Sequence, residues 1–261
     1  MPRAINAFAY FGGKTYKLKW LLPILDVPVS RYIEPFCGSA AVLLNRKPVL
    51  REVLNDADEA LVNVFQQLRD NRRNLLNALY FTPNSRVEFE KSLSIEGCTP
   101  LEAARRTLLR LQLTRTPTNN TGWRNNGKSA WARKLNEWSL VSKRLRTVVL
   151  EKKNALELLE IWASRIRKNP NIEGETLIYC DPPYLHTTRK TKGQDYKCEM
   201  SIEEHIKFLE IVRSLKCYVA ISGYESELYN EYLKDFLIHK KEYPNKMQKT
   251  LKSTEVLWTN Y

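Results

Sequence analysis

A chain of 261 residues, with 43% hydrophobic and 10% aromatic residues, is long enough for one generous α/β domain carrying a smaller insert. This composition excludes general disorder, and no apolar run is long enough to span a bilayer. The net charge of +13, from 42 Lys and Arg against 29 Asp and Glu, favours a polyanionic partner, with nucleic acid first and an anionic membrane second. A basic protein with no special partner is the remaining alternative.

Short apolar segments alternate with helical ones over the first 70 residues. Tyr32-Ile33 is expected to be a strand that leads into a loop at residues 34–39, and a helix is expected to follow at residues 40–44. A second strand at residues 49–54 ends before Asp56, and apolar residues at a spacing near 3.6 then predict a helix over residues 61–68. The alternation favours parallel strands with right-handed crossovers.

The alternation of strands and helices stops between residues 71 and 148, which are predicted to be mainly helical and are rich in Arg, Asn and Leu. A polar segment at residues 116–128 interrupts the helices and carries Trp123, either a core residue or one that touches a ligand. Arginines and lysines flank it on both sides, at Arg105, Arg106, Arg110, Arg133, Lys134, Lys143, Arg144 and Arg146. Residues 71–148 are therefore predicted to form an insert.

The α/β texture then returns. The later strands are expected at residues 177–180, 218–221, 236–240 and 255–259. Between the first two of these, Ser201 and Glu204 have the spacing of a capping box, which predicts a helix that begins after Ser201. The chain is thus predicted to be an α/β protein with a mostly parallel, Rossmann-like sheet flanked by helices.

Unusual residues follow four of the predicted strands. They are Glu34-Pro35-Phe36-Cys37-Gly38, Asp56, Asp181-Pro182-Pro183-Tyr184 and Ser222-Gly223-Tyr224. Open parallel sheets bind ligands outside the carboxyl ends of their strands. These segments are therefore predicted to line one site, with Glu34 and Gly38 among its residues.

The tetrapeptide Asp181-Pro182-Pro183-Tyr184 has the groups to hold a flat heterocycle that carries an amino group. The carboxylate and a backbone carbonyl fixed by the prolines can accept hydrogen bonds from that amine, and the tyrosine ring can stack on the heterocycle. The structural alternative is a proline-rich turn that leaves a strand.

A nucleoside is the second ligand that these strand ends predict. Asp56 lies 22 residues after Glu34, near the distance at which nucleotide-binding folds place an acid on ribose hydroxyls, although Asp58 competes for the role. One glycine, Gly38, replaces the three that a pyrophosphate needs, which favours S-adenosylmethionine over NAD. Gly13-Lys14-Thr15 resembles the end of a phosphate-binding loop, but Phe8 stands where that loop needs its first glycine.

Cysteine and histidine spacing predicts neither a metal site nor a disulfide framework. The five cysteines are scattered, and the three histidines form no triad and no metal-ligand spacing. The amino terminus lacks the apolar core of a signal peptide. A reduced, cytoplasmic protein is expected, monomeric in solution.

Four motifs in this order resemble the Dam-like (D12 class) DNA adenine-N6 methyltransferases. They are Ala9-Tyr10-Phe11-Gly12-Gly13-Lys14, Glu34-Pro35-Phe36-Cys37-Gly38-Ser39, Asn55-Asp56 and Asp181-Pro182-Pro183-Tyr184. Ser222-Gly223-Tyr224 and Glu255-Val256-Leu257-Trp258 resemble the phage-type branch of that family. The resemblance spans nearly the whole chain and implies a methyltransferase, in a restriction–modification setting, that acts on a flipped-out adenine in duplex DNA.

The resemblance also implies residue roles. Asp181 is expected to be the catalytic acid, which together with the Pro182 carbonyl accepts the hydrogens of the adenine amine, and Tyr184 completes the base cradle. The residues expected to bind the cofactor are Tyr10, Lys14, Glu34, Phe36, Gly38, Asp56 and Asp181. Read without the family, Phe36 is equally a core residue, Lys14 a solvated lysine and Tyr184 a cap on the sheet. Relatives often carry Asp where this chain has Asn154.

With that family as the frame, residues 1–70 and 149–261 are predicted to form the S-adenosylmethionine-binding catalytic domain, and residues 71–148 an inserted target-recognition subdomain. Loop arginines and asparagines can address base edges in the major groove, and helix lysines and arginines can hold phosphates. The expected DNA-binding residues are Arg115, Asn119, Asn120, Arg124, Asn126 and Arg189. A cytosine-N4 methyltransferase, an RNA adenine methyltransferase and a non-catalytic nucleic-acid binder remain as alternatives.

Overall fold

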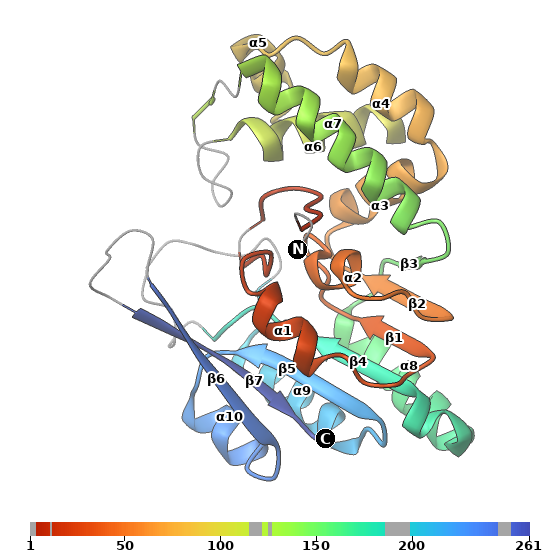
Figure 1. The fold of residues 1–261 in the computed structure, drawn as a ribbon, viewed down its shortest axis with the longest axis vertical. Helices are drawn as coiled ribbons and strands as arrows, with labels where there is room; N and C mark the ends of the chain where they lie inside the picture. Colours follow the sequence, from red (N-terminus) through yellow and green to blue (C-terminus); the bar gives the residue numbers. More distant parts are fainter. Residues whose placement is uncertain (1–3, 11, 115–121, 125–126, 186–198, 245–251) are drawn as a thin grey trace.

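The computed structural model describes residues 4–10, 12–114, 122–124, 127–185, 199–244 and 252–261 (Figure 1). In this part of the chain a seven-stranded sheet has the order β3-β2-β1-β4-β5-β7-β6. Its strands are β1 (Arg31–Glu34), β2 (Arg51–Asn55), β3 (Val149–Glu151), β4 (Thr176–Cys180), β5 (Tyr218–Gly223), β6 (Leu237–Pro244) and β7 (Lys252–Thr259). The sheet forms the middle layer of the fold.

Helices surround this sheet. They are α1 (Leu18–Ile24), α2 (Ala41–Asn45), α3 (Glu59–Asp70), α4 (Arg72–Tyr80), α5 (Arg86–Lys91), α6 (Pro100–Leu113), α7 (Gly127–Arg144), α8 (Ala155–Lys168), α9 (Ile202–Ser214) and α10 (Glu227–Tyr232), with a 3-10 turn at Pro170–Glu175. Helices α8, α9 and α10 pack on one face, and α1, α2 and α3 on the other. Helix α9 begins after Ser201 with the predicted capping box.

Strand β4 shows why the sequence forms a sheet buried on both sides. All five of its residues are buried. Successive strand side chains point to opposite faces, so Leu177 and Tyr179 join the core on one side, whereas Ile178 and Cys180 join the core on the other. A continuous apolar run is typical of a central parallel strand.

The strand pairings confirm a mostly parallel sheet. Strands β1 to β5 pair in parallel, and β7 pairs antiparallel with both β5 and β6. From β1 the chain goes to β2 on one side, whereas from β4 it goes to β5 on the other side. The crevice between the carboxyl ends of β1 and β4 is therefore the topological switch point, where open α/β sheets bind ligands.

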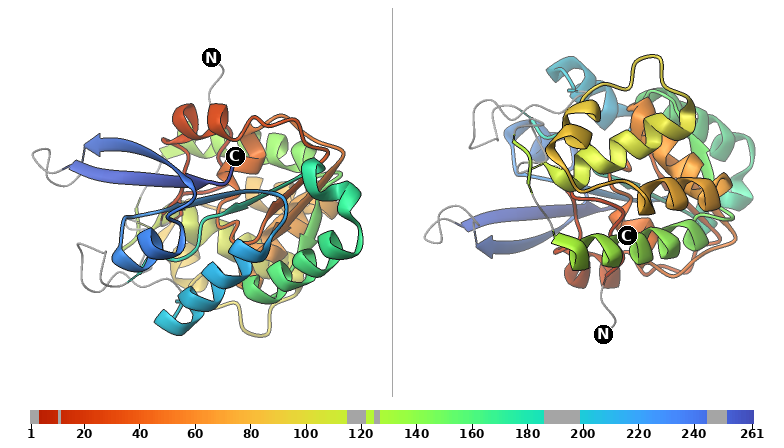
Figure 2. Two further views of the ribbon diagram at one scale, coloured as in Figure 1. Left: turned by 90° about the horizontal axis from the view of Figure 1, so that it is seen from below. Right: turned by 90° about the horizontal axis from the view of Figure 1, so that it is seen from above.

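The β6–β7 hairpin extends past the sheet, as Figure 2 shows. Pairing between β5 and β7 stops at Gly223 and Val256, but β6 and β7 remain paired as far as Pro244 and Lys252. Because β7 runs against the parallel strands, its first residues lie near their carboxyl ends. The hairpin therefore borders the switch point.

Helices α4 to α7 lie in the crossover from β2 to β3 and share a core with the sheet layer. Leu75, Leu108 and Trp138 belong to the same buried cluster as Tyr32 and Leu177. The indole Nε1 of Trp138 donates to the backbone carbonyl of Ala7 at 2.6 Å. The helices of residues 71–148 thus pack directly on the layer below, and their role as a recognition subdomain stays a prediction.

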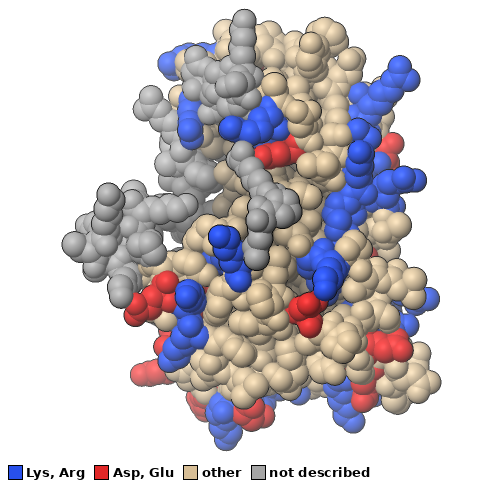
Figure 3. All heavy atoms as spheres, viewed as in Figure 1, with Lys and Arg blue, Asp and Glu red and all other residues tan. Residues whose placement is uncertain are grey.

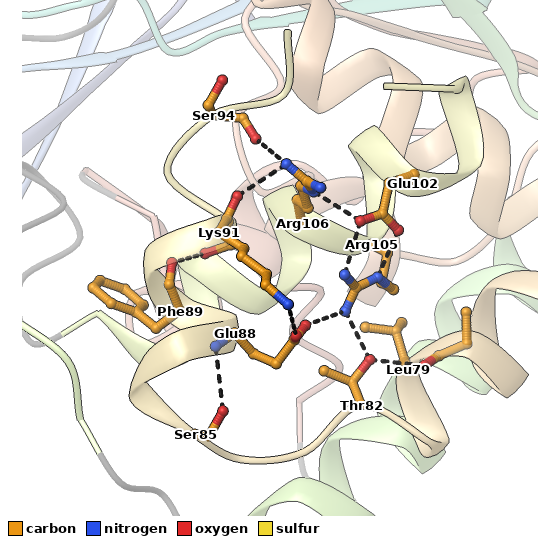
Figure 4. Close-up of polar contacts among 12 residues, drawn as sticks. Leu79, Thr82, Ser85, Glu88, Phe89, Lys91, Ser94, Glu102, Arg105 and Arg106 are labelled. Carbon is orange, nitrogen blue, oxygen red and sulfur yellow. Dashed lines mark hydrogen bonds and ion pairs between the residues drawn. The ribbon is translucent and has the colours of Figure 1, made fainter. Parts of the chain in front are cut away.

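An ion-pair network joins the helices of the insert (Figure 4). Arg105 of α6 bonds Glu102 in its own helix, Glu88 of α5 at 3.0 Å and the hydroxyl of Thr82 at 2.9 Å. Arg106 bonds Glu102 and the backbone carbonyls of Lys91 and Ser94. Hydrogen bonds from Arg105 lower the pKa of Glu102 to about 2. These arginines therefore hold the helices together.

Candidate active site

The carboxyl ends of β1, β2 and β4 open into one cavity. All residues that the sequence assigned to the cofactor line it, namely Tyr10, Lys14, Glu34, Phe36, Gly38, Asp56 and Asp181. They come from the amino-terminal segment and three strand ends that are far apart in the sequence. The parallel topology brings these ends together at the switch point.

The loop after β1 forms one wall of the cavity. Glu34 is buried and accepts hydrogen bonds from the hydroxyl of Tyr32 at 3.0 Å and the backbone N–H of Leu43 at 3.3 Å. Burial raises the pKa of Glu34 to about 8, although the bond from Tyr32 opposes this rise. The ring of Phe36 packs edge-on against Phe208 at 5.8 Å while it lines the cavity, so it belongs to both the core and the site.

Asp56 fixes this wall to the end of β2. Its Oδ2 accepts from the backbone N–H of Gly38 at 2.8 Å, and its Oδ1 accepts from that of Asp58 at 2.9 Å. Burial raises the pKa of Asp56, and these two backbone bonds lower it. Asp58 instead caps α3 by accepting from the N–H of Ala60. Each Asp56 oxygen has lone pairs beyond its backbone bond, so Asp56 is the better-placed acceptor for a ribose diol.

Asp181 and Lys14 form an ion pair at the end of β4. The ammonium Nζ of Lys14 lies 2.6 Å from each carboxylate oxygen of Asp181. The Lys14 side chain is 3% exposed and that of Asp181 19% exposed, which overturns the alternative of a solvated lysine. Burial raises the pKa of Asp181, and the charge of Lys14 opposes that rise. Lys14 therefore favours the ionised carboxylate, the form that accepts hydrogen bonds.

Tyr184 and Pro182 are both buried beside this pair. The hydroxyl of Tyr184 accepts from Lys14 Nζ at 2.7 Å, and its ring packs edge-on against Tyr224 at 4.7 Å. Tyr184 and Pro182 do not line the cavity, whereas Pro183 does. The aromatic pair of Tyr184 and Tyr224 thus lies next to the carboxylate of Asp181.

Sequence reasoning gave no role to two charged residues behind Lys14, although one of them, Glu255, belongs to a motif that resembles the family. Glu255 of β7 is buried, with its Oε1 accepting from the hydroxyl of Tyr184 at 2.9 Å and lying 3.4 Å from Lys14 Nζ. Its other oxygen pairs with the ammonium of Lys17, also buried. A single acid beside the apolar run Val256-Leu257-Trp258 is the signal that could have found Glu255, because a buried charge needs a partner.

The far wall of the cavity includes Asn154, Met200 and Glu204. The Oδ1 of Asn154 accepts from the backbone N–H of Leu156 at 2.8 Å and so caps α8. Glu204 accepts from the N–H of Ser201 in the capping box. Sequence reasoning assigned no role to Asn154 or Met200.

Of the residues expected to bind DNA, Arg124 alone lies in the described part of the chain, and its side chain is exposed. Arg115, Asn119, Asn120, Asn126 and Arg189 lie outside the described residues. The neighbouring Trp123 is half-buried against Phe89 and Leu109, which favours the core residue among the two alternatives that the sequence left open. On the face shown in Figure 3, lysine and arginine side chains gather along the edge formed by α4 and α7.

In the part of the chain that the structure describes, no helix has the length and apolarity to cross a membrane. Across the same residues, no group of three or more His, Cys, Asp or Glu side chains is arranged to hold a metal ion.

Comparison with known proteins agrees with this arrangement. Residues 10–247 match the family described as D12 class N6 adenine-specific DNA methyltransferase. The chain is also 24% identical over 266 residues to the Type II methyltransferase M1.LlaDCHI of Lactococcus lactis subsp. cremoris, which covers 96% of this chain and 93% of the relative. The family match spans both the strand-end motifs and the helical insert.

Proposed function

This chain belongs to the family of D12 class N6 adenine-specific DNA methyltransferases, and we propose that its methyl donor is S-adenosylmethionine, bound in the cavity beside Asp181. The enzyme transfers a methyl group to the N6 amino group of adenine in DNA. The observation that carries the proposal is the cavity itself, which joins a catalytic carboxylate to a wall equipped for a nucleoside.

The residues of the cavity fit this donor. Gly38 has a positive φ of 47° and lies so close to Tyr10 that a Cβ there would be 2.9 Å from its ring, which leaves a narrow cradle next to Asp56. Asp56 has acceptors for the ribose hydroxyls, and Phe36 offers an apolar ring for the adenine. S-adenosylmethionine supplies an electrophilic methyl group on a sulfonium centre.

Asp181 is proposed to act on the target amine. The lone pair of the adenine amino nitrogen is drawn into the ring, which makes the nitrogen a poor nucleophile. Asp181 and the carbonyl of Pro182 accept its two hydrogens and so favour tetrahedral geometry at the nitrogen. Lys14 uses one acceptor position on each Asp181 oxygen, and a second lone pair on each remains for the amine. Positioning and electrostatics supply most of the rate gain.

The target base is proposed to leave the duplex before the reaction. A base inside the stack is out of reach of a carboxylate held in a cavity, so it must be flipped out. Tyr184, which packs against Tyr224, is proposed to replace the lost stacking. The insert of residues 71–148 is proposed to read the recognition sequence, with Arg124 at a base edge.

We also propose that the enzyme works as a monomer in the cytoplasm, and that it belongs to a restriction–modification system, as the name of its Lactococcus relative suggests. The four cysteines among the described residues are free thiols, as expected in a reducing compartment. Light scattering after size-exclusion chromatography should give the mass of one chain, and the mass of two chains would contradict the proposed monomer.

Nucleoside analysis tests the proposed reaction. Unmethylated plasmid DNA, RNA and free adenosine are each incubated with the protein and isotope-labelled S-adenosylmethionine, and the nucleosides are then separated by mass. We expect label only in N6-methyldeoxyadenosine from DNA. Label in N4-methyldeoxycytidine, or faster labelling of RNA, would overturn the proposed substrate.

Cofactor binding is tested separately by titration with S-adenosylmethionine. Asp56→Ala removes the proposed ribose acceptor and is expected to raise the Kd at least about tenfold, because hydrogen bonds to charged groups contribute roughly 1.5–3 kcal/mol. Asp58→Asn keeps a helix-capping oxygen and serves as the matched control. An equal loss of affinity in both variants would contradict the assignment of Asp56.

A further inference from the structure

Glu255 and Lys17 form a buried ion pair. Glu255 contacts Lys14 and Tyr184 beside Asp181, but neither member of the pair lines the cavity. We propose that Glu255 is a positioning residue for methyl transfer, which holds Lys14 and Tyr184 against Asp181 while Lys17 balances its charge. The inference rests on the proposed role of Asp181. It adds a carboxylate of β7 beside a site that is lined by the ends of β1, β2 and β4, the amino-terminal segment and the first residues of α8 and α9.

The position of Glu255 follows from the antiparallel strand that carries it. Val256 pairs with Gly223 at the end of β5, so Glu255 lies one residue beyond the carboxyl end of that strand. This is the edge of the sheet at which β4 delivers Asp181. A parallel strand would place its last residues at this edge. Because β7 is antiparallel, its first residues lie beside the site instead.

The hydrogen bonds around Glu255 set the direction of the Tyr184 hydroxyl. That hydroxyl donates to Glu255 Oε1 at 2.9 Å and accepts from Lys14 Nζ at 2.7 Å. Because its one hydrogen points to Glu255, its lone pair faces Lys14. Replacing the carboxylate of Glu255 by a neutral amide weakens this acceptor, and the hydroxyl can then turn to Oδ1 of Asp181, 3.4 Å away, which disturbs its bond to Lys14.

The charges of the cluster explain the need for Lys17. Two carboxylates, Asp181 and Glu255, compete for the ammonium of Lys14, which lies 2.6 Å from the first and 3.4 Å from the second. Lys17 pairs with the other oxygen of Glu255 and balances that charge. Lys14 is therefore left to Asp181, where it favours the ionised carboxylate.

The two members of the pair act on Asp181 with opposite signs. The charge of Glu255 raises the pKa of Asp181, and the charge of Lys17 lowers it, both less strongly than burial and Lys14. Among the described residues, the charged and titratable groups that interact with this cluster are Lys14, Tyr16, Lys17, Glu34, Tyr179, Cys180, Tyr184, Tyr224, Tyr229, Tyr243 and Glu255. Replacing Glu255 should therefore move the acid limb of the pH–rate profile to lower pH, and replacing Lys17 should move it to higher pH.

The experiment compares Glu255→Gln, Lys17→Met and the double variant with the unchanged enzyme. Single-turnover methylation of unmethylated plasmid DNA is followed with tritiated S-adenosylmethionine over a range of pH. Glu52→Gln is the matched control, because Glu52 is an equally buried carboxylate whose partners are Arg46 and Arg144, in another part of the sheet. Circular dichroism and cofactor titration show that each variant is folded.

Glu255→Gln is expected to slow the single-turnover step about 10- to 100-fold, the cost of a misplaced catalytic group, with the Kd for the cofactor nearly unchanged. Its acid limb should move to lower pH, that of Lys17→Met to higher pH, and that of the double variant back toward the original position. Glu52→Gln should leave the limb in place.

Equal rates in Glu255→Gln and Glu52→Gln, or limbs that move in the same direction in both single variants, would overturn the proposal. If Glu255→Gln does not fold, Lys17→Met alone tests the proposal. An acid limb that stays at the same pH in Lys17→Met, or moves to lower pH, would overturn the proposal. Activity retained by Asp181→Ala would instead remove the proposed function, on which the inference rests.

Discussion

At Gly38, both the backbone conformation and the packing disfavour any residue with a side chain. Its φ of +47° lies in the left-handed region that side chains disfavour. A Cβ at this position would also lie 2.9 Å from Cδ1 of Tyr10, whose ring lines the same cavity. The glycine therefore allows Tyr10 and the loop after β1 to approach closely around the cofactor site.

Gly38→Ala is predicted to weaken binding of S-adenosylmethionine and to lower the free energy of unfolding by about 1–2 kcal/mol. Gly97→Ala is the matched control, because Gly97 has a φ of +68° but no atom within 4 Å of an added Cβ. Both variants should lose stability in urea unfolding, and only Gly38→Ala should lose affinity in titration. Unchanged affinity in Gly38→Ala would contradict the cradle.

Glu34 links the site to pH through its buried carboxyl. Its pKa is raised to about 8 by burial, so between about 4.5 and 8 the folded protein keeps a proton that the unfolded chain has lost. Stability is therefore predicted to fall as pH rises through this window, by at most about 1.4 kcal/mol per pH unit from this group. Glu34→Gln cannot ionise and should flatten the dependence in urea unfolding. The same slope in both proteins would contradict the assigned pKa.

At the scale of elements, strong local patterns predicted most of the sheet. The apolar runs of β1, β2, β4 and β5 and the capping box before α9 appear in the structure where the sequence placed them. Strand β3 was missed because it has three residues at the edge of the sheet, with Val149 exposed. The outer halves of β6 and β7 were missed because they pair only with each other and carry polar residues such as Lys241 and Glu242.

Arg105 is the residue that connects the helices of the insert. It joins α6 to α5 and to the turn after α4 through Glu88, Glu102 and Thr82 (Figure 4). Arg105→Met is predicted to lower the free energy of unfolding by about 1–3 kcal/mol, because it removes hydrogen bonds from a charged donor to Glu88, Glu102 and Thr82.

Arg213→Met is the control for this change. Arg213 and Asp235 form an exposed pair, with side chains 37% and 58% exposed, and such pairs contribute about 0–1 kcal/mol. Urea unfolding should therefore separate the two variants. Equal losses in the free energy of unfolding would show that the ion-pair network of Arg105 stabilises the protein no more than an exposed ion pair does.

At the scale of the whole molecule, parallel topology explains why the site was readable from the sequence. Glu34, Asp56 and Asp181 each follow a strand, and parallel strands end at the same edge, so three local motifs predict one cavity. Glu255 and Lys17 lie 238 residues apart and meet only because β7 is antiparallel, which no local pattern encodes. The limits of the insert were read from composition, which does not reveal that its helices share a core with the sheet.

The net charge of +13 and the exposed Arg124 lead to a prediction about DNA reading. If Arg124 contacts a base edge, Arg124→Ala should relax the preference at one position of the recognition sequence, at a cost of about 1–3 kcal/mol for the preferred base. Sequencing that detects modified adenines in plasmid DNA measures this preference. Methylation slowed equally at every sequence would identify Arg124 as a phosphate contact and contradict the assignment.

The most direct test of the account is the single-turnover rate of Asp181→Ala. The variant is loaded with labelled S-adenosylmethionine and mixed with unmethylated duplex DNA, after titrations have shown that it still binds both ligands. At a cofactor concentration that fills the site, the account predicts DNA binding close to that of the unchanged enzyme and no detectable N6-methyldeoxyadenosine, because the acceptor of the amine hydrogens is gone. A rate near normal would contradict the claim that this carboxylate activates the adenine nitrogen.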